Sequence, residues 1–177
     1  MSAVEPSAAS LAALCGLARA CLGAAAVSLA VVEDTSLYYV AADGAGAEEI
    51  VGTRLPAGRG IAGFTAATGQ SLTVRDPVTD PRFARDVGEA TGYVPASIQC
   101  VPVDADGEVV AVLSILDRAD STGGAPVIDW VTAVAAALVP ALVDSGSAVA
   151  DRVAGLAPGD RARAVEVIDA VLGVFER

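Results

Sequence analysis

The chain has 177 residues, a formal net charge of −11 and 54 % hydrophobic residues, much of them alanine and valine. That length fits one domain with some additional helix, and the hydrophobic content is ample for a core. The negative charge disfavours contact with a phosphate backbone, so we expect no nucleic-acid partner.

The chain contains no histidine, lysine or asparagine, and every basic residue is arginine. Without histidine there is no Ser–His–Asp or Cys–His catalytic group and no histidine-containing zinc or haem site. Without lysine there is no Walker-type phosphate loop and no Schiff base. We therefore predict no metal site and no catalytic residues of these classes.

The cysteines Cys15, Cys21 and Cys100 show neither a C-x-x-C pair nor a zinc-ribbon spacing. We expect three small buried hydrophobic side chains, with a redox or ligand-attachment role as the alternative. Their odd number and sparse use suggest a reducing cytoplasm. No positive charge precedes the first apolar run, and the run at 127–143 is interrupted by polar residues. We therefore expect neither export nor a membrane span.

The first half of the chain is predicted to contain a helix, a hairpin and a second helix. Apolar residues recur at helical spacing between Leu11 and Leu22, after a start at 5–7, and Gly23 provides a stop. Valine-rich runs with turn residues between them are typical of a hairpin. In chain order we expect a helix at 11–22, strands at 25–33 and 37–42, a loop at 43–46, an edge strand at 49–55, a helix at 61–68 and a strand at 71–74.

The segment 76–95 is predicted as a long loop, because its three prolines and two glycines leave room for only a short helix near 82–89. Loops of this length inside a compact domain are often functional. Strands at 96–103 and 108–116 follow, with the tight turn Asp106-Gly107 between them. The second strand is apolar on both faces, so we place it centrally in the sheet.

The C-terminal part is predicted to be helical after a linker at 119–125. The helix at 126–143 presents an apolar stripe and carries Trp130 near that face. The stripe consists of Ile128, Val131, Val134 or Ala135, and Leu138. A break at 145–147 and helical segments at 148–156 and 161–175 follow. We thus predict a domain over 1–144, including its flanking helices, and a helical tail over 145–177.

This order of parts resembles a GAF domain, a small sensor module that holds a ligand or cofactor under a loop on one face of an antiparallel sheet. The resemblance rests on G-x-x-L-P-x-G-x-G-I-A-G from Gly52, D-P-R-F from Asp80, S-I-Q-C-V-P-V from Ser97 and A-V-L-S-I-L-D-R from Ala111. Each motif alone is weak, but their order and spacing are specific. They imply a stand-alone bacterial member with an α/β (α+β), GAF-like or PAS-like fold. Its central antiparallel sheet of five or six strands would be flanked by helices that pack together behind it.

The glycine-rich joint before the second helix has a physical reason of its own. Gly58 and Gly60 allow a sharp turn into the helix, and Gly63 is expected to let that helix approach the sheet. The letters G-R-G-I-A-G also match the dinucleotide-binding pattern, but the later strands form a hairpin, so we interpret the motif as a structural joint. Asp80 before Pro81 is expected to cap a helix.

By resemblance, a ligand pocket would be lined by Phe64, Phe83, Tyr93, Ile98, Cys100 and Ser114. Ser97 and Gln99 alternate with Ile98 and Cys100, and the sequence leaves open which pair faces the pocket. The alternative is that these side chains fill the space and no ligand binds. The nearby arginines are interpreted as ion pairs with Asp76, Asp80 and Asp86 rather than as an anion clamp. These arginines are Arg59, Arg75, Arg82 and Arg85.

The resemblance implies a non-enzymatic, cytoplasmic small-molecule sensor or regulatory domain. It would act through a loop-covered pocket and a helical homodimer interface, and would signal to a separate partner protein. The ligand and any cofactor are not identified. One alternative is a small thiol enzyme of the free methionine sulfoxide reductase type that uses Cys100; another is a dimerisation module without a ligand. Cyclic-nucleotide-binding members carry an N-K-F-D-E-type motif, and the absence of asparagine and lysine weakens that reading.

Overall fold

The computed structural model describes residues 8–119 and 125–154, with side chains in the last helix described as far as residue 141. The strands are β1 (Ala26–Glu33), β2 (Ser36–Gly44), β3 (Arg54–Pro56), β4 (Leu72–Arg75), β5 (Ser97–Ala105) and β6 (Glu108–Leu116). The helices are α1 (Ala8–Leu22), α2 (Ala47–Ile50), α3 (Gly60–Thr68), the 3-10 turn η1 (Pro77–Thr79), α4 (Arg85–Ala90) and α5 (Ala125–Ala154).

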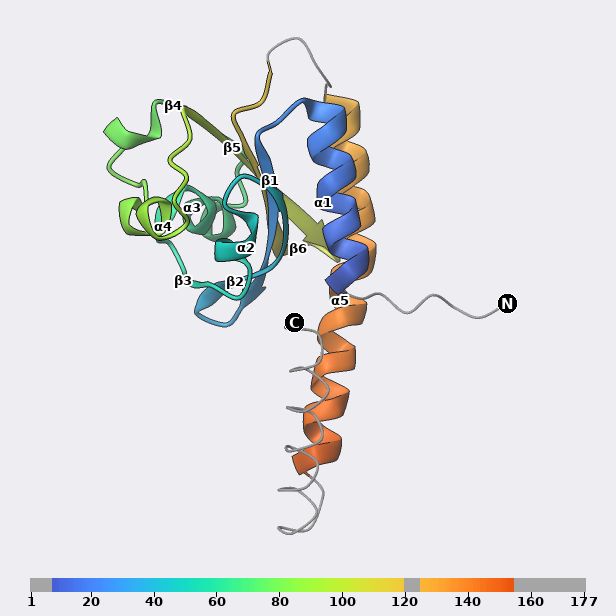
Figure 1. The fold of residues 1–177 in the computed structure, drawn as a ribbon. Helices are drawn as coiled ribbons and strands as arrows, with labels where there is room; N and C mark the ends of the chain where they lie inside the picture. Colours follow the sequence, from blue (N-terminus) through green and yellow to red (C-terminus); the bar gives the residue numbers. More distant parts are fainter. Residues whose placement is uncertain (1–7, 120–124, 155–177) are drawn as a thin grey trace. The chain divides into compact units, whose positions relative to one another are not determined.

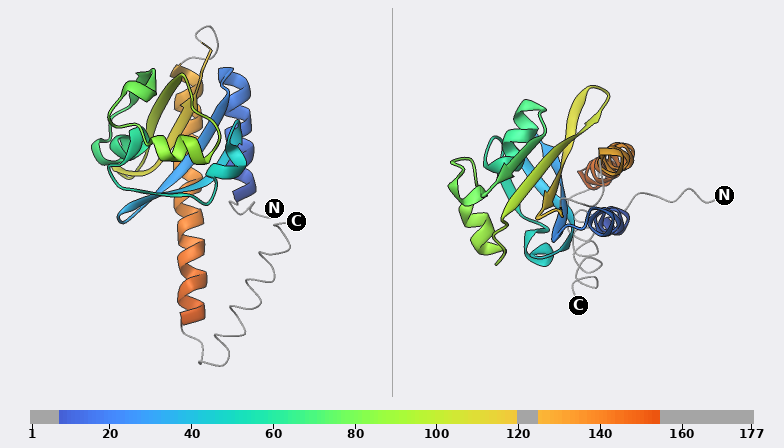
Figure 2. Two further views of the ribbon diagram at one scale, coloured as in Figure 1. Left: turned by 60° about the vertical axis from the view of Figure 1, so that its left-hand side comes forward. Right: turned by 90° about the horizontal axis from the view of Figure 1, so that it is seen from above.

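One antiparallel sheet of six strands organises the domain, in the order β3-β2-β1-β6-β5-β4. The two hairpins β1–β2 and β5–β6 meet where β1 pairs with β6. Helices α1 and α5 cover one face of the sheet, and α2, α3 and α4 lie on the other (Figures 1 and 2). The predicted fold class and the central position of the strand at 108–116 are confirmed.

The alternation of side chains along β1 and β6 gives the sheet two separate cores. Leu29 and Leu113 are opposite one another in the register and almost completely buried, and alternation directs both towards one face of the sheet. Ala30 and Val112, also a registered pair, belong to the cluster on the other face. The two faces therefore bury different sets of side chains.

Helix α5 uses a slightly different stripe from the predicted one. Its buried residues are Ile128, Val131, Ala135 and Val139. Of the two predicted alternatives, Ala135 is buried and Val134 is not, and Val139 is buried in place of Leu138. Trp130 is 50 % exposed, so the prediction that it lies near the apolar face is wrong. It precedes Val131 by one residue, which is about 100° around the helix.

The region 47–56 also differs from the prediction, which placed an edge strand at 49–55. Residues 47–50 form the short helix α2, which follows Gly46 in a left-handed conformation, and only Arg54–Pro56 joins the sheet. Glu48 and Glu49 lie in the first turn of α2, where the helix dipole favours negative charge. Four residues are too few to show helical periodicity in a sequence.

Helix α5 continues to Ala154, so the predicted break at 145–147 is wrong. Glycine and serine each disfavour a helix by only about 1 kcal/mol or less, which neighbouring turns readily offset. The compact unit that carries the sheet ends at Pro140. The expected helix start at 5–7, the body of the linker at 119–125 and the helix at 161–175 lie outside the described residues. The division at 144/145 stays a prediction. Among the described residues, no helix has the length and apolar character needed to span a bilayer.

Candidate functional site

A cavity of about 100 Å³ lies on the face of the sheet opposite α1 and α5. Strands β1, β2, β5 and β6 contribute its floor, α2 and α3 its sides, and residues of the segment 83–95 its outer wall. This volume is far more than the roughly 15 Å³ that one ordered water needs. The cavity therefore has room for a small organic molecule.

The floor is a row of small side chains that crosses three strands. In the sheet register Ser28 of β1 lies opposite Ser114 of β6, and Ser114 lies opposite Cys100 of β5. The Cys100 sulfur and the Ser114 hydroxyl oxygen are 3.4 Å apart, within hydrogen-bonding distance. Because these three side chains are small, the space above the sheet centre is left open.

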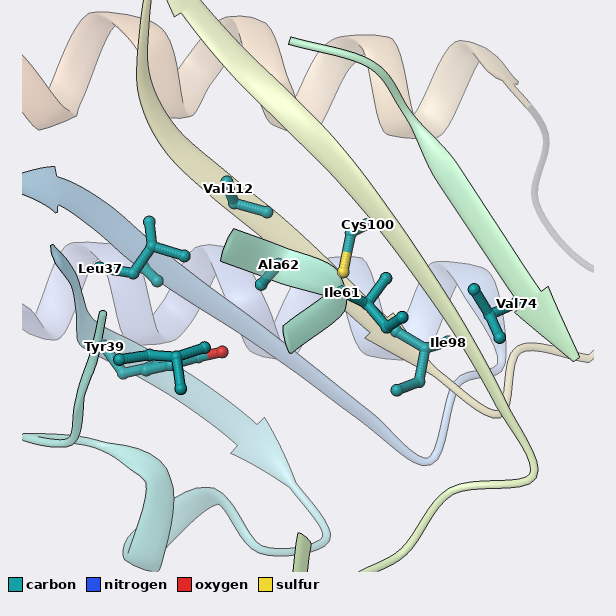
Figure 3. Packing of buried hydrophobic residues seen from close by; sticks show 10 residues of the cluster. Leu37, Tyr39, Ile61, Ala62, Val74, Ile98, Cys100 and Val112 are labelled. Atoms are coloured by element: carbon teal, nitrogen blue, oxygen red, sulfur yellow. The ribbon is translucent and has the colours of Figure 1, made fainter. Parts of the chain in front are cut away.

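Two hydroxyl groups at the cavity lack a hydrogen-bond partner. Ser28 is 8 % exposed and Tyr39 is 7 % exposed, both residues line the cavity, and within the described residues neither hydroxyl is bonded to another protein group. Burial, with a smaller contribution from Cys100, raises the pKa of Tyr39, so its phenol stays neutral. In Figure 3 the Tyr39 hydroxyl points from β2 towards the side chains of Ile61 and Ile98.

The outer wall is fastened to the sheet beside the cavity. The Tyr93 hydroxyl donates a hydrogen bond to the Asp117 carboxylate at the end of β6. The other Asp117 oxygen accepts the backbone N–H of Ser97 at 2.7 Å. Burial, together with the Asp117 hydrogen bond, raises the pKa of Tyr93 to about 12. Asp117 thereby holds the end of the loop 76–95 against the first residue of β5.

The structure brings five of the six residues expected in a pocket to this one cavity: Phe83, Tyr93, Ile98, Cys100 and Ser114. Phe64 is not among the lining residues, because it lies on a different side of α3 and its ring is beneath the Arg82 guanidinium, 5.2 Å from it. Ile98 and Cys100 are the members of β5 that face the cavity.

Sequence reasoning missed Ser28 and Tyr39. A signal for Ser28 was available, because it is the single polar residue within an otherwise apolar strand interior, as Ser114 is in β6. Tyr39 gave no such signal, since Tyr38 and Tyr39 are adjacent and alternation alone does not say which one points inward.

The arginines do not line this cavity. Arg59 pairs with Asp86 at 2.6 Å and Arg82 with Asp80 at 2.7 Å, as the ion-pair interpretation predicted for these two, whereas Arg85 donates to the Val78 carbonyl oxygen at 2.9 Å. Hydrogen bonds from Arg82 hold the pKa of Asp80 at about 2. Asp80 accepts the backbone N–H of Arg82 at 2.9 Å and so caps a turn, whereas α4 begins only at Arg85. The expectation that Asp80 caps a helix is therefore wrong.

Gly58 and Gly60 adopt positive φ angles of 76° and 72°, as the glycine-rich joint predicted. Gly63 allows α3 to approach the sheet closely, as expected, but at the edge of the sheet and not at its centre. A Cβ added there would lie 3.2 Å from the backbone of Gly58 and 3.3 Å from the Pro56 oxygen. The close approach of α3 is therefore to the end of the edge strand β3, at Pro56, and to the turn at Gly58 that follows it.

The three cysteines occupy distinct environments. Cys100 is 1 % exposed, and burial raises the pKa of its thiol to about 12. Cys15 is also buried, and burial with the nearby Asp43 raises its thiol pKa to about 12. Cys21 is exposed, so the expectation of three buried cysteines is wrong for this residue. Cys15 and Cys21 lie on α1, across the sheet from Cys100. The described residues contain no group of three or more potential metal ligands.

Comparison with known proteins places this geometry in a family. A segment of 82 residues is 34 % identical to "Probable 3',5'-cyclic phosphodiesterase pde-5" of Caenorhabditis elegans; it covers 46 % of this chain and 11 % of that protein. The GAF domain of a phosphoenolpyruvate-protein phosphotransferase from Coxiella burnetii is similar with a TM-score of 0.65 and 19 % identity, covering 84 % of this chain and 89 % of that one. The free methionine-R-sulfoxide reductase of Neisseria meningitidis is similar with a TM-score of 0.62 and 21 % identity, over 80 % and 83 % of the two chains.

The two structural likenesses show a shared fold only, since their sequence identities are low. The family model for the GAF domain matches residues 3–142, most of the chain. Domains of this family commonly bind small-molecule ligands and regulate partner proteins. The motifs that carried the resemblance, from Gly52 to Arg118, all lie within the match. The chain therefore belongs to the GAF domain family.

Proposed function

We propose that this chain is a non-enzymatic sensor domain that binds a small molecule in the cavity under the loop 76–95. The observation that carries the proposal is the cavity itself, which has a floor of small residues, largely apolar walls and a few hydroxyl groups. Pockets of this composition are typical of small-molecule sites. The free thiols Cys15 and Cys100 are typical of a reducing compartment, which supports a cytoplasmic location.

The signal would pass through the sheet to the helices behind it. Ser28 and Ser114 lie under the cavity, and their neighbours Leu29 and Leu113 pack on the other face. A ligand that favours one arrangement of the loop and the floor shifts the population of conformations on that opposite face. A change at α1 and α5 would then be read by a separate partner protein.

The placement of the cysteines supports this proposal over the thiol-enzyme alternative. A nucleophilic cysteine reacts as the thiolate, and the raised pKa of Cys100 leaves it protonated at neutral pH. Turnover through a disulfide would also require a second thiol nearby, but Cys15 and Cys21 are on the opposite side of the sheet. We therefore propose that the likeness to a reductase extends to the fold and not to the chemistry.

Native mass spectrometry of the protein purified from its own host is the direct test of ligand binding. We expect the wild-type chain to carry a reproducible non-covalent adduct that is lost under denaturing conditions. Ala84→Phe, at the cavity wall, should lose the adduct because the larger ring fills the space. Ala57→Phe, at an exposed position, is the matched control and should retain it. A clean apo mass for all three proteins would contradict the proposal and favour the dimerisation module without a ligand.

We also propose that the α1 and α5 faces turned away from the sheet form a homodimer interface. Leu17 on α1 is 49 % exposed and Trp130 on α5 is 50 % exposed. The exposed positions around them are mostly alanines: Ala13, Ala20, Ala133 and Ala137. Uncovered apolar helix faces of this kind commonly pair two subunits, and a large aromatic residue is a frequent centre of such contacts.

The double variant Leu17→Glu/Trp130→Glu is expected to be a monomer by light scattering at micromolar concentrations, whereas the wild type is a dimer. Both side chains are half exposed, so the fold should survive and the circular dichroism should be unchanged. Val51→Glu is the control, since Val51 is 45 % exposed and lies in the turn between α2 and β3. A wild-type chain that is itself monomeric would overturn the proposed homodimer interface.

A further inference from the structure

We infer that the cavity is built for an uncharged ligand that carries a carbonyl or hydroxyl group. This inference rests on the proposed function, because it names the class of molecule that the same cavity would take. It is drawn from the charges and the free hydrogen-bonding groups of the lining.

Among the residues that the structure describes, those that line the cavity include no charged side chain. The carboxylate of Asp117, which follows the lining residue Leu116, is already occupied by Tyr93 and Ser97. Arg59, which precedes α3, and Arg82, in the loop 76–95, are paired with carboxylates that do not line the cavity. An anion or cation entering the site would lose its hydration and meet no counter-charge, which strongly disfavours binding.

The lining nevertheless offers hydrogen bonds that the protein itself does not use. The residues Ser28 and Tyr39 are more than nine-tenths buried, and within the described residues no hydrogen bond joins either hydroxyl to another protein group. Buried polar groups are almost always hydrogen-bonded, so two unpartnered hydroxyls at one cavity indicate a bonding group on the occupant. Each hydroxyl can donate or accept, and so both can serve a carbonyl oxygen or a hydroxyl of a ligand.

The remaining polar groups of the floor contribute differently. Cys100 and Ser114 are within hydrogen-bonding distance of each other, so they present little unused capacity. Their main effect is their small size, which leaves space between the floor and Ile61 of α3. The polar part of the ligand is therefore assigned to the side of β1 and β2, and its apolar part to the side of β5 and α3.

Three near-isosteric probes test the inference: benzamide, which is neutral, benzoate, which is an anion, and toluene, which has no polar group. Their affinities for the full chain are measured by titration with ¹⁵N chemical-shift mapping, so that binding is localised to the cavity residues. We expect benzamide to bind at least about tenfold more tightly than benzoate, because the anion has no counter-charge there.

The variants Tyr39→Phe and Ser28→Ala preserve the shape of the cavity and remove one hydroxyl each. We expect each to weaken benzamide binding about fivefold and to leave toluene binding unchanged, in keeping with the loss of one neutral hydrogen bond. Benzoate binding at the cavity as tightly as benzamide would overturn the ligand class and leave the proposed sensor function standing. Failure of all three probes to shift the cavity resonances would overturn the binding site itself, and the proposed function with it.

Discussion

Gly44→Ala is expected to lower the free energy of unfolding by about 3 kcal/mol or more, because the added methyl group has no room. Gly44 ends β2 with a φ of +102°, and a Cβ there would lie 2.2 Å from the carbonyl oxygen of Ala25. That carbonyl is held in place, since it accepts the Ala45 N–H at 3.1 Å. Relief of the clash therefore requires the β1–β2 pairing to shift.

Gly52→Ala is the matched control for this substitution. Gly52 has a similar φ of +88°, but nothing lies within 4 Å of an added Cβ. Only the backbone conformation is then disfavoured, by about 1 to 2 kcal/mol. Urea unfolding of the two variants separates the clash from the backbone effect. Equal losses of unfolding free energy in the two variants would show that the close approach at Gly44 does not itself destabilise the alanine variant.

Asp117→Ala is expected to destabilise the protein by about 3 kcal/mol, since hydrogen bonds to a charged acceptor contribute roughly 1.5 to 3 kcal/mol. The substitution leaves the Ser97 N–H and the Tyr93 hydroxyl without their acceptor. It also places alanine at a φ of +50°, a conformation that aspartate and asparagine tolerate better. Asp117→Asn, which keeps an acceptor and tolerates this conformation, should lose only about 1 kcal/mol.

Tyr93→Phe completes a double-mutant cycle with Asp117→Ala and isolates the contact between the loop and the sheet. The folded-state pKa of Tyr93 is raised from 10 to about 12, so its stabilising effect is complete below pH 10. It is lost as the pH rises towards 12. The difference in unfolding free energy between wild type and Tyr93→Phe should therefore shrink between pH 10 and 12. A difference that stays constant over this range would show that the phenol proton is not part of the contact.

Much of the fold could be predicted because its turns and helix ends are determined by residues that are adjacent in the sequence. Gly60 and Gly69 bound α3, and Asp106-Gly107 sets the β5–β6 turn, so nearest neighbours alone define these elements. The apolar character of β6 on both faces requires cover on both sides, which is possible only near the centre of the sheet. The central place of β6 followed from this requirement and the type of sheet from the family resemblance, whereas the order of the other strands was not predicted.

The cavity was less predictable because its lining depends on register and helix phase. The register between β1 and β2 shifts between Leu29 and Ala30, so that Ala42 and Tyr39, three residues apart, both reach the cavity. A bulge of this kind moves side chains from one face to the other, and period-two alternation does not reveal it. The phase of α3 is likewise set by the turn before it, which directs Ile61 and Ala62 inward and leaves Phe64 outside the cavity.

The separation of the two sheet faces has a consequence for how such a protein can change over generations. Residues under the cavity, such as Ser28 and Ser114, alternate with Leu29 and Leu113, which carry the packing against the helices. A substitution at Ser28 or Ser114 changes the shape and polarity of the cavity floor. It leaves the packing of Leu29 and Leu113 on the other face intact. Recognition and folding thus draw on different positions of the same two strands. Under the proposed function, a single change at Ser28 or Ser114 would alter the ligand preference while Leu29 and Leu113 continue to hold the fold.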